Sequence, residues 1–109
     1  MDKEVKKVYR YWLSKQDNQI HKEIAFVKLI NMNGHMKYVI WNEEQKSIGD
    51  IEKEEFEQNM LKRSVAQAIY LYKEDDELAK KHYKWAISEK IKDAKETLDK
   101  YLKIKAELK

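Results

Sequence analysis

The sequence predicts an α+β protein in which an antiparallel sheet is followed by one long C-terminal helix. Three observations predict this class. An Asn-Gly pair separates two apolar runs, short segments are rich in β-branched and aromatic residues, and a charged stretch with helical spacing runs from about residue 76 to 108. The 109 residues suit a single domain, with a β-rich part over 1–73 and the helical part over 74–109.

The first strand is expected at about residues 5–14. The run Val8-Tyr9-Arg10-Tyr11-Trp12-Leu13 is rich in side chains that favour strands. A helix over residues 3–15 is the second choice for this segment. The polar run Gln16-Asp17-Asn18-Gln19 then predicts a turn.

The next two strands are expected at about residues 22–32 and 36–43. Asn33-Gly34 lies between them and supplies the two positive-φ positions of a type I′ turn, which is a strong hairpin signal. Both faces of the first arm are apolar, so that strand is expected to be central in the sheet. The first three strands together predict an antiparallel meander.

The middle of the chain is ambiguous. Residues 47–51 (Ser-Ile-Gly-Asp-Ile) suggest a strand end or a turn. The segment from Glu52 to Tyr72 fits one helix capped by Asp50, or a charged loop or short helix followed by a strand at about 67–73. The second interpretation is favoured, because the run Ile69 to Tyr72 is β-prone and stops at an acidic cluster, residues 74–77.

The last helix is expected at about residues 76–108, capped by Asp75 or Asp76. A helix of this length spans about 48 Å, whereas a compact globule of this chain is about 34 Å across. We therefore expect the helix to project from the domain and to form a homo-oligomer through its apolar stripe. The alternative is a shorter or kinked helix that folds back on its own sheet. The predicted interface residues have nearly heptad spacing, interrupted by Lys105: Ile87, Ile91, Ala94, Leu98, Tyr101 and Leu108.

The charges are distributed unevenly along the chain, whose net charge is +3. Residues 1–42 hold eight Lys/Arg and four Asp/Glu, a net charge of +4; residues 43–77 hold five and eleven, a net charge of −6; and residues 78–109 hold ten and five, a net charge of +5. Such a chain can pair with a second copy, or these charges can simply be solvated. We see no secretory signal and no stretch apolar enough to cross a membrane, so we expect a cytoplasmic location and no membrane partner. With no cysteine, a secreted disulfide scaffold is excluded.

The residues that carry catalysis in other proteins are scattered here, so we expect no enzymatic activity, no cofactor and no metal site. Cysteine is absent, and no serine stands in a nucleophile-elbow sequence. The histidines His21, His35 and His82 lack the spacing of metal ligands, and His82 is expected at the surface or at an interface. The acidic cluster at residues 74–77 is better explained as a helix cap than as a cation site.

A candidate ligand site surrounds one of the two arginines. Arg10 stands within an aromatic run, and a guanidinium beside aromatic rings suits a nucleotide, whose base stacks while its phosphate is gripped. The alternative is that the aromatic residues are core and Arg10 lies at the rim. Nucleic acid is the less expected partner, because acids alternate with the lysines of the last helix. The candidate ligand-binding residues are Arg10, Tyr11, Trp12, Trp41 and Tyr72.

Three stretches also carry a resemblance: Lys7-Val8-Tyr9-Arg10-Tyr11, Lys46-Ser47-Ile48-Gly49, and the run from Tyr70 to Ala79 that leads into the last helix. This pattern resembles small accessory proteins of bacteriophages that infect low-GC Gram-positive bacteria. The resemblance implies an anti-defence protein. It would either sequester a cyclic nucleotide, as the Thoeris anti-defence family does, or inhibit a host defence protein, as anti-CRISPR proteins do, with Glu43 to Glu57 imitating nucleic acid.

The functional expectation is therefore a non-enzymatic binding protein that neutralises a host factor or a nucleotide signal and acts as an oligomer. Two alternatives remain open: a nucleic-acid-binding accessory protein, and a structural oligomer without a ligand.

Overall fold

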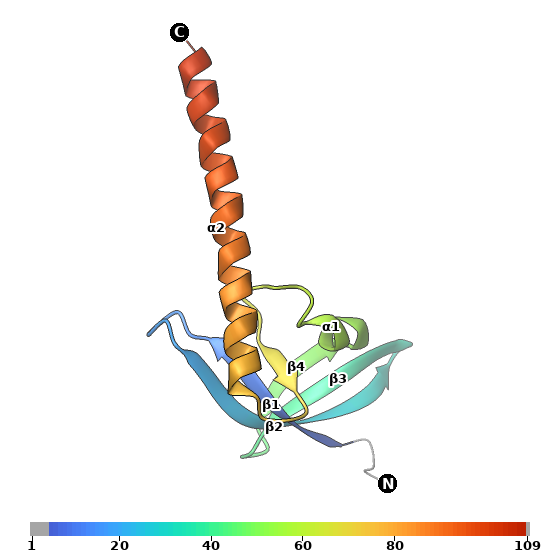
Figure 1. The fold of residues 1–109 in the computed structure, drawn as a ribbon. Coiled ribbons are helices and arrows are strands. Elements are labelled where there is room, and N and C mark those ends of the chain that lie inside the picture. Colours follow the sequence, from blue (N-terminus) through green and yellow to red (C-terminus); the bar gives the residue numbers. More distant parts are fainter. Residues whose placement is uncertain (1–4, 109) are drawn as a thin grey trace.

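The computed structural model describes residues 5–108, which form five strands and two helices (Figure 1). The elements in chain order are β1 (Lys6–Leu13), β2 (Ile20–Met32), β3 (His35–Asn42), β4 (Ser47–Glu52), α1 (Lys53–Gln58), β5 (Ile69–Leu71) and α2 (Asp76–Glu107). The predicted class, a sheet followed by a long C-terminal helix, is confirmed.

The strands form one antiparallel sheet in the order β4-β3-β2-β1-β5. β2 lies in the middle of the sheet, as its apolar character on both faces predicted. Asn33 and Gly34, with φ angles of 54° and 87°, make the tight turn that joins β2 to β3. This turn fixes the hairpin register, in which Met32 pairs with His35.

One strand was not predicted, because residues 47–51 were interpreted as a strand end or a turn. The structure places them in β4, which pairs with β3. The side-chain oxygen of Asn42 accepts hydrogen bonds from the backbone N–H groups of Glu44 and Lys46, at 3.0 and 2.9 Å, and turns the chain back beside β3. Gly49 has a φ of +147°, which other residues rarely adopt, beside a register irregularity at Ile40/Trp41.

The ambiguous segment after β4 follows the second of its two predicted interpretations. It contains the short helix α1, an irregular stretch and the short edge strand β5. Phe56 of α1 explains why this helix docks on the sheet. Its ring stacks on Tyr38 of β3 at 4.2 Å between centroids and approaches Tyr70 of β5 at 5.0 Å.

Two apolar clusters lie on the two faces of β1. Side chains that are directly opposite in an antiparallel pair share a face, and neighbours along a strand alternate. Val8 therefore belongs to one face, whose cluster includes Phe56 of α1. Tyr11 belongs to the other face, where it packs with Ile69 of β5 and with Tyr83 of α2. α1 and α2 are thus attached to different faces of the same strand.

α2 begins at the sheet and then leaves the body (Figure 1). Asp75, one of the two predicted caps, accepts a hydrogen bond from the backbone N–H of Leu78 at 3.0 Å. The last buried residue of α2 is Ala86. The molecule measures 69 × 33 × 21 Å and has a radius of gyration of 18.2 Å, against about 13 Å for a compact chain of this length. The predicted overhang is confirmed, and the alternative of a shorter helix folded back on the sheet is wrong.

Candidate functional site

The most unusual surface is the part of α2 beyond the body, residues 87–108, which we call the projecting segment. Each of its residues is exposed. Its large apolar side chains are between 40% exposed, at Ile87, and 73% exposed, at Leu108. All six residues predicted for an oligomer interface lie in this segment: Ile87, Ile91, Ala94, Leu98, Tyr101 and Leu108. In a helix, residues spaced by three and four lie on one side, so these residues form a continuous apolar stripe.

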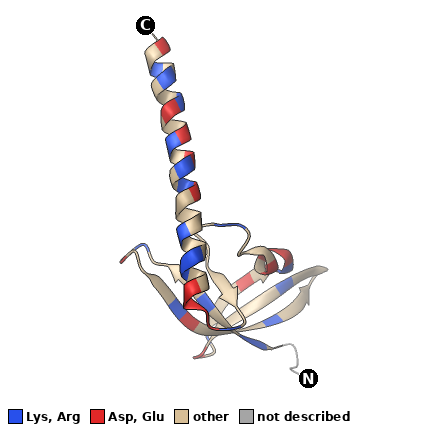
Figure 2. Cartoon of the chain, in the orientation of Figure 1, with Lys and Arg blue, Asp and Glu red and all other residues tan. Residues whose placement is uncertain are grey.

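Most positions of the projecting segment outside the stripe are charged, although Leu102 and Ile104 are apolar and exposed (Figure 2). Lysines and acids alternate along it, a pattern that supports a solvated helix through pairs three or four residues apart. Near the base of the segment, Glu89 forms an ion pair with Arg63 of the body at 3.7 Å. At its far end the backbone N–H of Leu108 donates to the carbonyl of Ile104 at 3.0 Å. None of these contacts covers the stripe, whose residues are all exposed.

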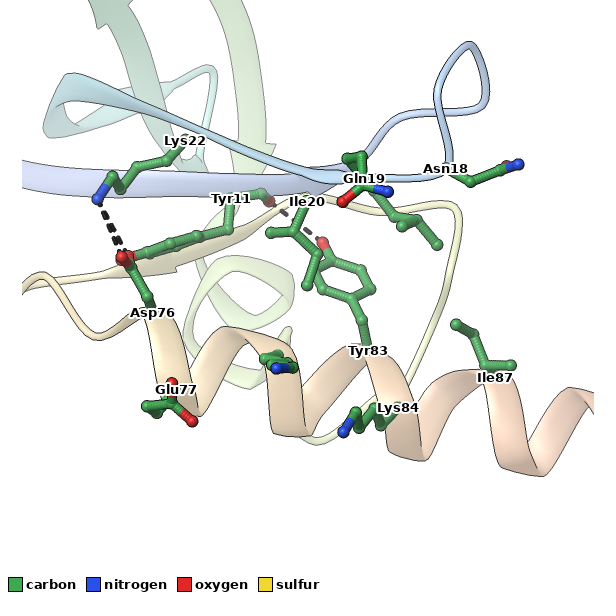
Figure 3. Close-up of a pocket in the computed structure, with 12 residues that line it drawn as sticks. Tyr11, Asn18, Gln19, Ile20, Lys22, Asp76, Glu77, Tyr83, Lys84 and Ile87 are labelled. Atoms are coloured by element: carbon green, nitrogen blue, oxygen red, sulfur yellow. Dashed lines mark hydrogen bonds and ion pairs between the residues drawn. The ribbon is translucent and has the colours of Figure 1, made fainter.

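A hydrogen-bond network fixes the base of α2 to the sheet (Figure 3). The Tyr11 hydroxyl donates to the Asp76 carboxylate at 2.7 Å and accepts from the backbone N–H of Asp75 at 3.0 Å. Lys22 donates to Asp76 at 3.1 Å. Two turns further along α2, the Tyr83 hydroxyl reaches the backbone carbonyls of Tyr11 and Gln67, at 3.1 and 2.7 Å. These bonds set the direction in which α2 leaves the body.

The pKa values of this network suit its hydrogen bonds. Burial, followed by the bond to Asp76, raises the pKa of Tyr11 to about 12. Burial also raises the pKa of Tyr83 to about 12. The bond from Tyr11, together with Lys22, lowers the pKa of the Asp76 carboxyl. At neutral pH both phenols therefore keep the proton that they donate, and Asp76 stays ionised.

A cavity of about 480 Å³ lies between this network and the start of the projecting segment (Figure 3). Tyr11, Ile20 and Tyr83 form much of its apolar wall. Lys80 and Lys84 also line it, and neither forms an ion pair with any other residue between positions 5 and 108. Lys22, Asp76 and Glu77 line the cavity as well, so its charged lining is three lysines and two acids beside an apolar wall. Ile87 lines the cavity too, so the cavity opens onto the base of the apolar stripe.

The five candidate ligand-binding residues do not form one site. Arg10 and Trp12 lie together, with the guanidinium carbon 4.7 Å from the ring centroid. Glu23 already engages this guanidinium, at 3.1 Å, and His21 stacks on Trp12 at 5.5 Å. Tyr11 is only 1% exposed and points to the opposite face of β1.

The remaining two candidates lie elsewhere. Trp41 is on β3, two strands from β1, and pairs with Phe26, which places it on the face opposite Arg10. Tyr72 follows β5 and is exposed, with the ammonium of Lys6 5.5 Å from its ring centroid. Of the five residues, the structure brings together only Arg10 and Trp12. The sequence did not predict the cavity at the base of α2, because Lys80 and Lys84 are not distinguishable from the other lysines of this lysine-rich helix.

His82 differs from the expectation that it lies at the surface or an interface. It is 2% exposed and meets the ring of Tyr83 edge-on, at 4.8 Å between centroids. Burial lowers the pKa of its imidazole below the usual value. His82 lies one helical turn after Ala79 and one turn before Ala86, both of which are buried, so helical spacing alone could have indicated this position.

Within residues 5–108, no three His, Asp or Glu side chains are placed to hold a metal ion together. In the same range no helix is both long and apolar enough to cross a membrane. No protein-family model matches the chain, and the comparisons with curated proteins and with solved structures find no similar protein.

Proposed function

We propose that this is a non-enzymatic binding protein that associates with itself through the apolar stripe of α2 and presents its sheet body to a target. The observation that carries the proposal is the projecting segment, on which large apolar side chains remain open to solvent along one side of the helix.

The energetics favour a covering partner. Full burial of one Leu or Ile side chain stabilises by about 1.5–3 kcal/mol. Covering the whole stripe buries several such side chains and therefore stabilises the complex by several times this free energy. Scattered apolar residues on a surface are normal, whereas a continuous stripe marks an interaction site. A helix also gains most of its stability from packing, and the projecting segment has almost none within its own chain. A second copy supplies the same stripe and is therefore the simplest partner.

The target proposed for the sheet body is a host defence protein or a host nucleotide signal. This part of the proposal draws on the resemblance to small phage accessory proteins and on the acidic residues of β4 and α1. Asp50, Glu52, Glu54, Glu55 and Glu57 lie within two consecutive elements at one end of the sheet. Lys37 and Lys53 pair with three of these five acids, and the acids outnumber these lysines. Such a surface can imitate a nucleic-acid backbone toward a protein that binds one.

Sedimentation velocity over a range of protein concentrations tests the self-association. The wild type is expected to form a dimer or a larger oligomer as the concentration rises through the micromolar range. The double variant Ile91→Ser/Leu98→Ser is expected to sediment as a monomer, because it removes two large side chains from the stripe.

The matched control is Lys92→Ser/Asp99→Ser, which changes two residues of the same helix outside the stripe and should still associate. A wild type that stays monomeric at hundreds of micromolar, or a control that dissociates as fully as the stripe variant, would contradict the proposal.

A second candidate function is the capture of a nucleotide, and the cavity beside Lys80 and Lys84 favours it. Aromatic walls can stack a base while ammonium groups bind phosphate. The test is the shift in melting temperature with cyclic and linear nucleotides. A stabilising nucleotide should lose its effect in Lys80→Ala/Lys84→Ala and keep it in Lys92→Ala/Lys103→Ala. If Arg10→Ala abolishes the shift instead, the nucleotide binds beside Trp12.

A further inference from the structure

The apolar stripe has the spacing of one strand of a two-stranded coiled coil. We propose that a second copy of this chain covers it, with the two α2 helices antiparallel and Leu98 of each copy against Tyr101 of the other. This inference rests on the self-association proposed above and adds its geometry. In the heptad a to g, the a positions are Ile91, Leu98 and Lys105, and the d positions are Ile87, Ala94, Tyr101 and Leu108.

The acidic residues of the projecting segment all lie on the side of the helix that faces away from the stripe. The positions beside the stripe, e and g, hold Lys90 and Lys95 and no acidic residue, and Lys105 lies in the stripe itself. The stripe side therefore carries only positive charge. Every acid of the segment lies at position b, c or f, which face away from the stripe: Glu89, Asp93, Glu96, Asp99 and Glu107.

A parallel, in-register pair brings these lysines against one another. In that arrangement each a residue meets its own copy, so Lys105 faces Lys105 within the seam. Position g of one helix also meets position e of the next heptad of the other, which places Lys90 against Lys95 twice. Like charges in contact oppose association and act against this orientation. Ala94 would face Ala94, which leaves the seam underpacked.

An antiparallel pair can avoid each of these contacts. There, a residues pack against d residues, and e meets e and g meets g. When Leu98 lies against Tyr101, Ile91 lies against Leu108 of the second copy. Lys105 then faces the small Ala94, over which its aliphatic stem can pack while its ammonium group reaches water.

In the same register the flanking lysines also meet uncharged residues. Lys95 lies beside Leu102 of the second copy, and Thr97 lies beside Ile104. Shifting the pairing by one heptad toward the base places Lys95 against Lys95, and a second such shift places Lys80 against Lys105. The register with Leu98 against Tyr101 therefore avoids lysine–lysine contact and covers the outer part of the stripe.

The geometry has a consequence for binding. The two-fold axis lies between residues 99 and 100, so the two sheet bodies stand at opposite ends of a rod. At 1.5 Å per residue, the starts of the two α2 helices are roughly 70 Å apart. Such a dimer presents two copies of the same surface in opposite directions and can bridge two copies of a target.

A distance between spin labels tests the orientation. The chain has no cysteine, so Ser88→Cys gives one labelling site per copy. Ser88 is exposed and lies just outside the proposed overlap of residues 91–108. The antiparallel register predicts about 35 Å between the two labels, whereas a parallel pair brings them within about 20 Å. A distance under 20 Å would overturn the antiparallel arrangement.

Cysteine cross-linking tests the register. The variants Leu98→Cys and Tyr101→Cys are mixed in equal amounts and oxidised mildly, and the products are identified by mass. The mixed cross-link is expected to dominate, and a pool that contains only cross-links between identical variants would contradict the register. Lys92→Cys mixed with Asp99→Cys, both facing away from the stripe, is the matched control and should link far less.

The outcomes separate this inference from the proposal on which it depends. A wild type that remains monomeric in sedimentation overturns the self-association itself. A dimer with a short Ser88→Cys distance preserves the self-association and overturns only the antiparallel geometry. The Ser88→Cys substitution changes no residue of the stripe. The distance between its labels therefore decides the orientation even if the variants at positions 98 and 101 associate weakly.

Discussion

The two ends of α2 have similar composition and opposite surroundings. Tyr83, near the start, is 1% exposed and its hydroxyl lies within hydrogen-bond distance of two backbone carbonyls, whereas Tyr101, near the end, is 63% exposed. The base of the helix is held by the Asp75 cap and by tertiary contacts on the sheet, whereas every residue of the projecting segment is exposed.

One continuous helix therefore has two environments. Its first three turns complete the core of the body, while the remainder leaves an apolar stripe exposed. The contrast can be tested because the same substitution is available in both regions, with different expected effects.

The largest effect is expected from removing the buried tyrosine. Tyr83→Ala should lower the free energy of unfolding by about 3–5 kcal/mol, because it leaves a cavity between α2 and Tyr11. Tyr101→Ala should lower it by less than about 0.5 kcal/mol in dilute, monomeric protein. Urea unfolding followed by circular dichroism measures both. Equal losses would erase the distinction between the two regions.

A smaller effect is expected from the network at the base of α2. Tyr11→Phe keeps the ring but removes the bond to Asp76 and the bond from the Asp75 backbone, and should cost about 1–2 kcal/mol. Tyr9→Phe on the same strand is the control, since no hydrogen bond is found for the Tyr9 hydroxyl within residues 5–108, and its effect should be much smaller. If the two variants unfold alike, the Tyr11 bonds do not anchor the helix.

The smallest effect is expected from pH. Burial lowers the pKa of His82 in the folded state, so the unfolded chain binds a proton more readily just below pH 6.5. The free energy of unfolding should therefore fall as the pH falls from 7 toward 5. The lowered carboxyl pKa values of Asp17 and Asp76 lie below 3.8, outside this window.

His82→Gln, which cannot be protonated, should flatten this pH dependence of the melting temperature. His35→Gln, at the exposed start of β3, should leave it unchanged. A slope that persists in His82→Gln would show that another group causes it.

The sequence by itself determined the features that depend on neighbouring residues. Asn33-Gly34 specified the turn between β2 and β3 because few other pairs accept two positive φ angles. Asp75 specified the start of α2, because its carboxylate accepts the bond from Leu78. The unbroken charged stretch after it predicted a helix longer than the body, which the 69 Å length of the molecule confirms.

Only the tertiary structure decided which residues lie together and which face is covered. Alternation along β1 puts Arg10 and Tyr11 on different faces, but the packing of Tyr11 against Tyr83 depends on α2 returning to one particular face. β4 formed because the turn at Asn42 returned the chain to a free strand edge. Contacts such as Lys22 with Asp76 join residues far apart in the chain, and a local pattern cannot encode a partner that the chain reaches only after folding.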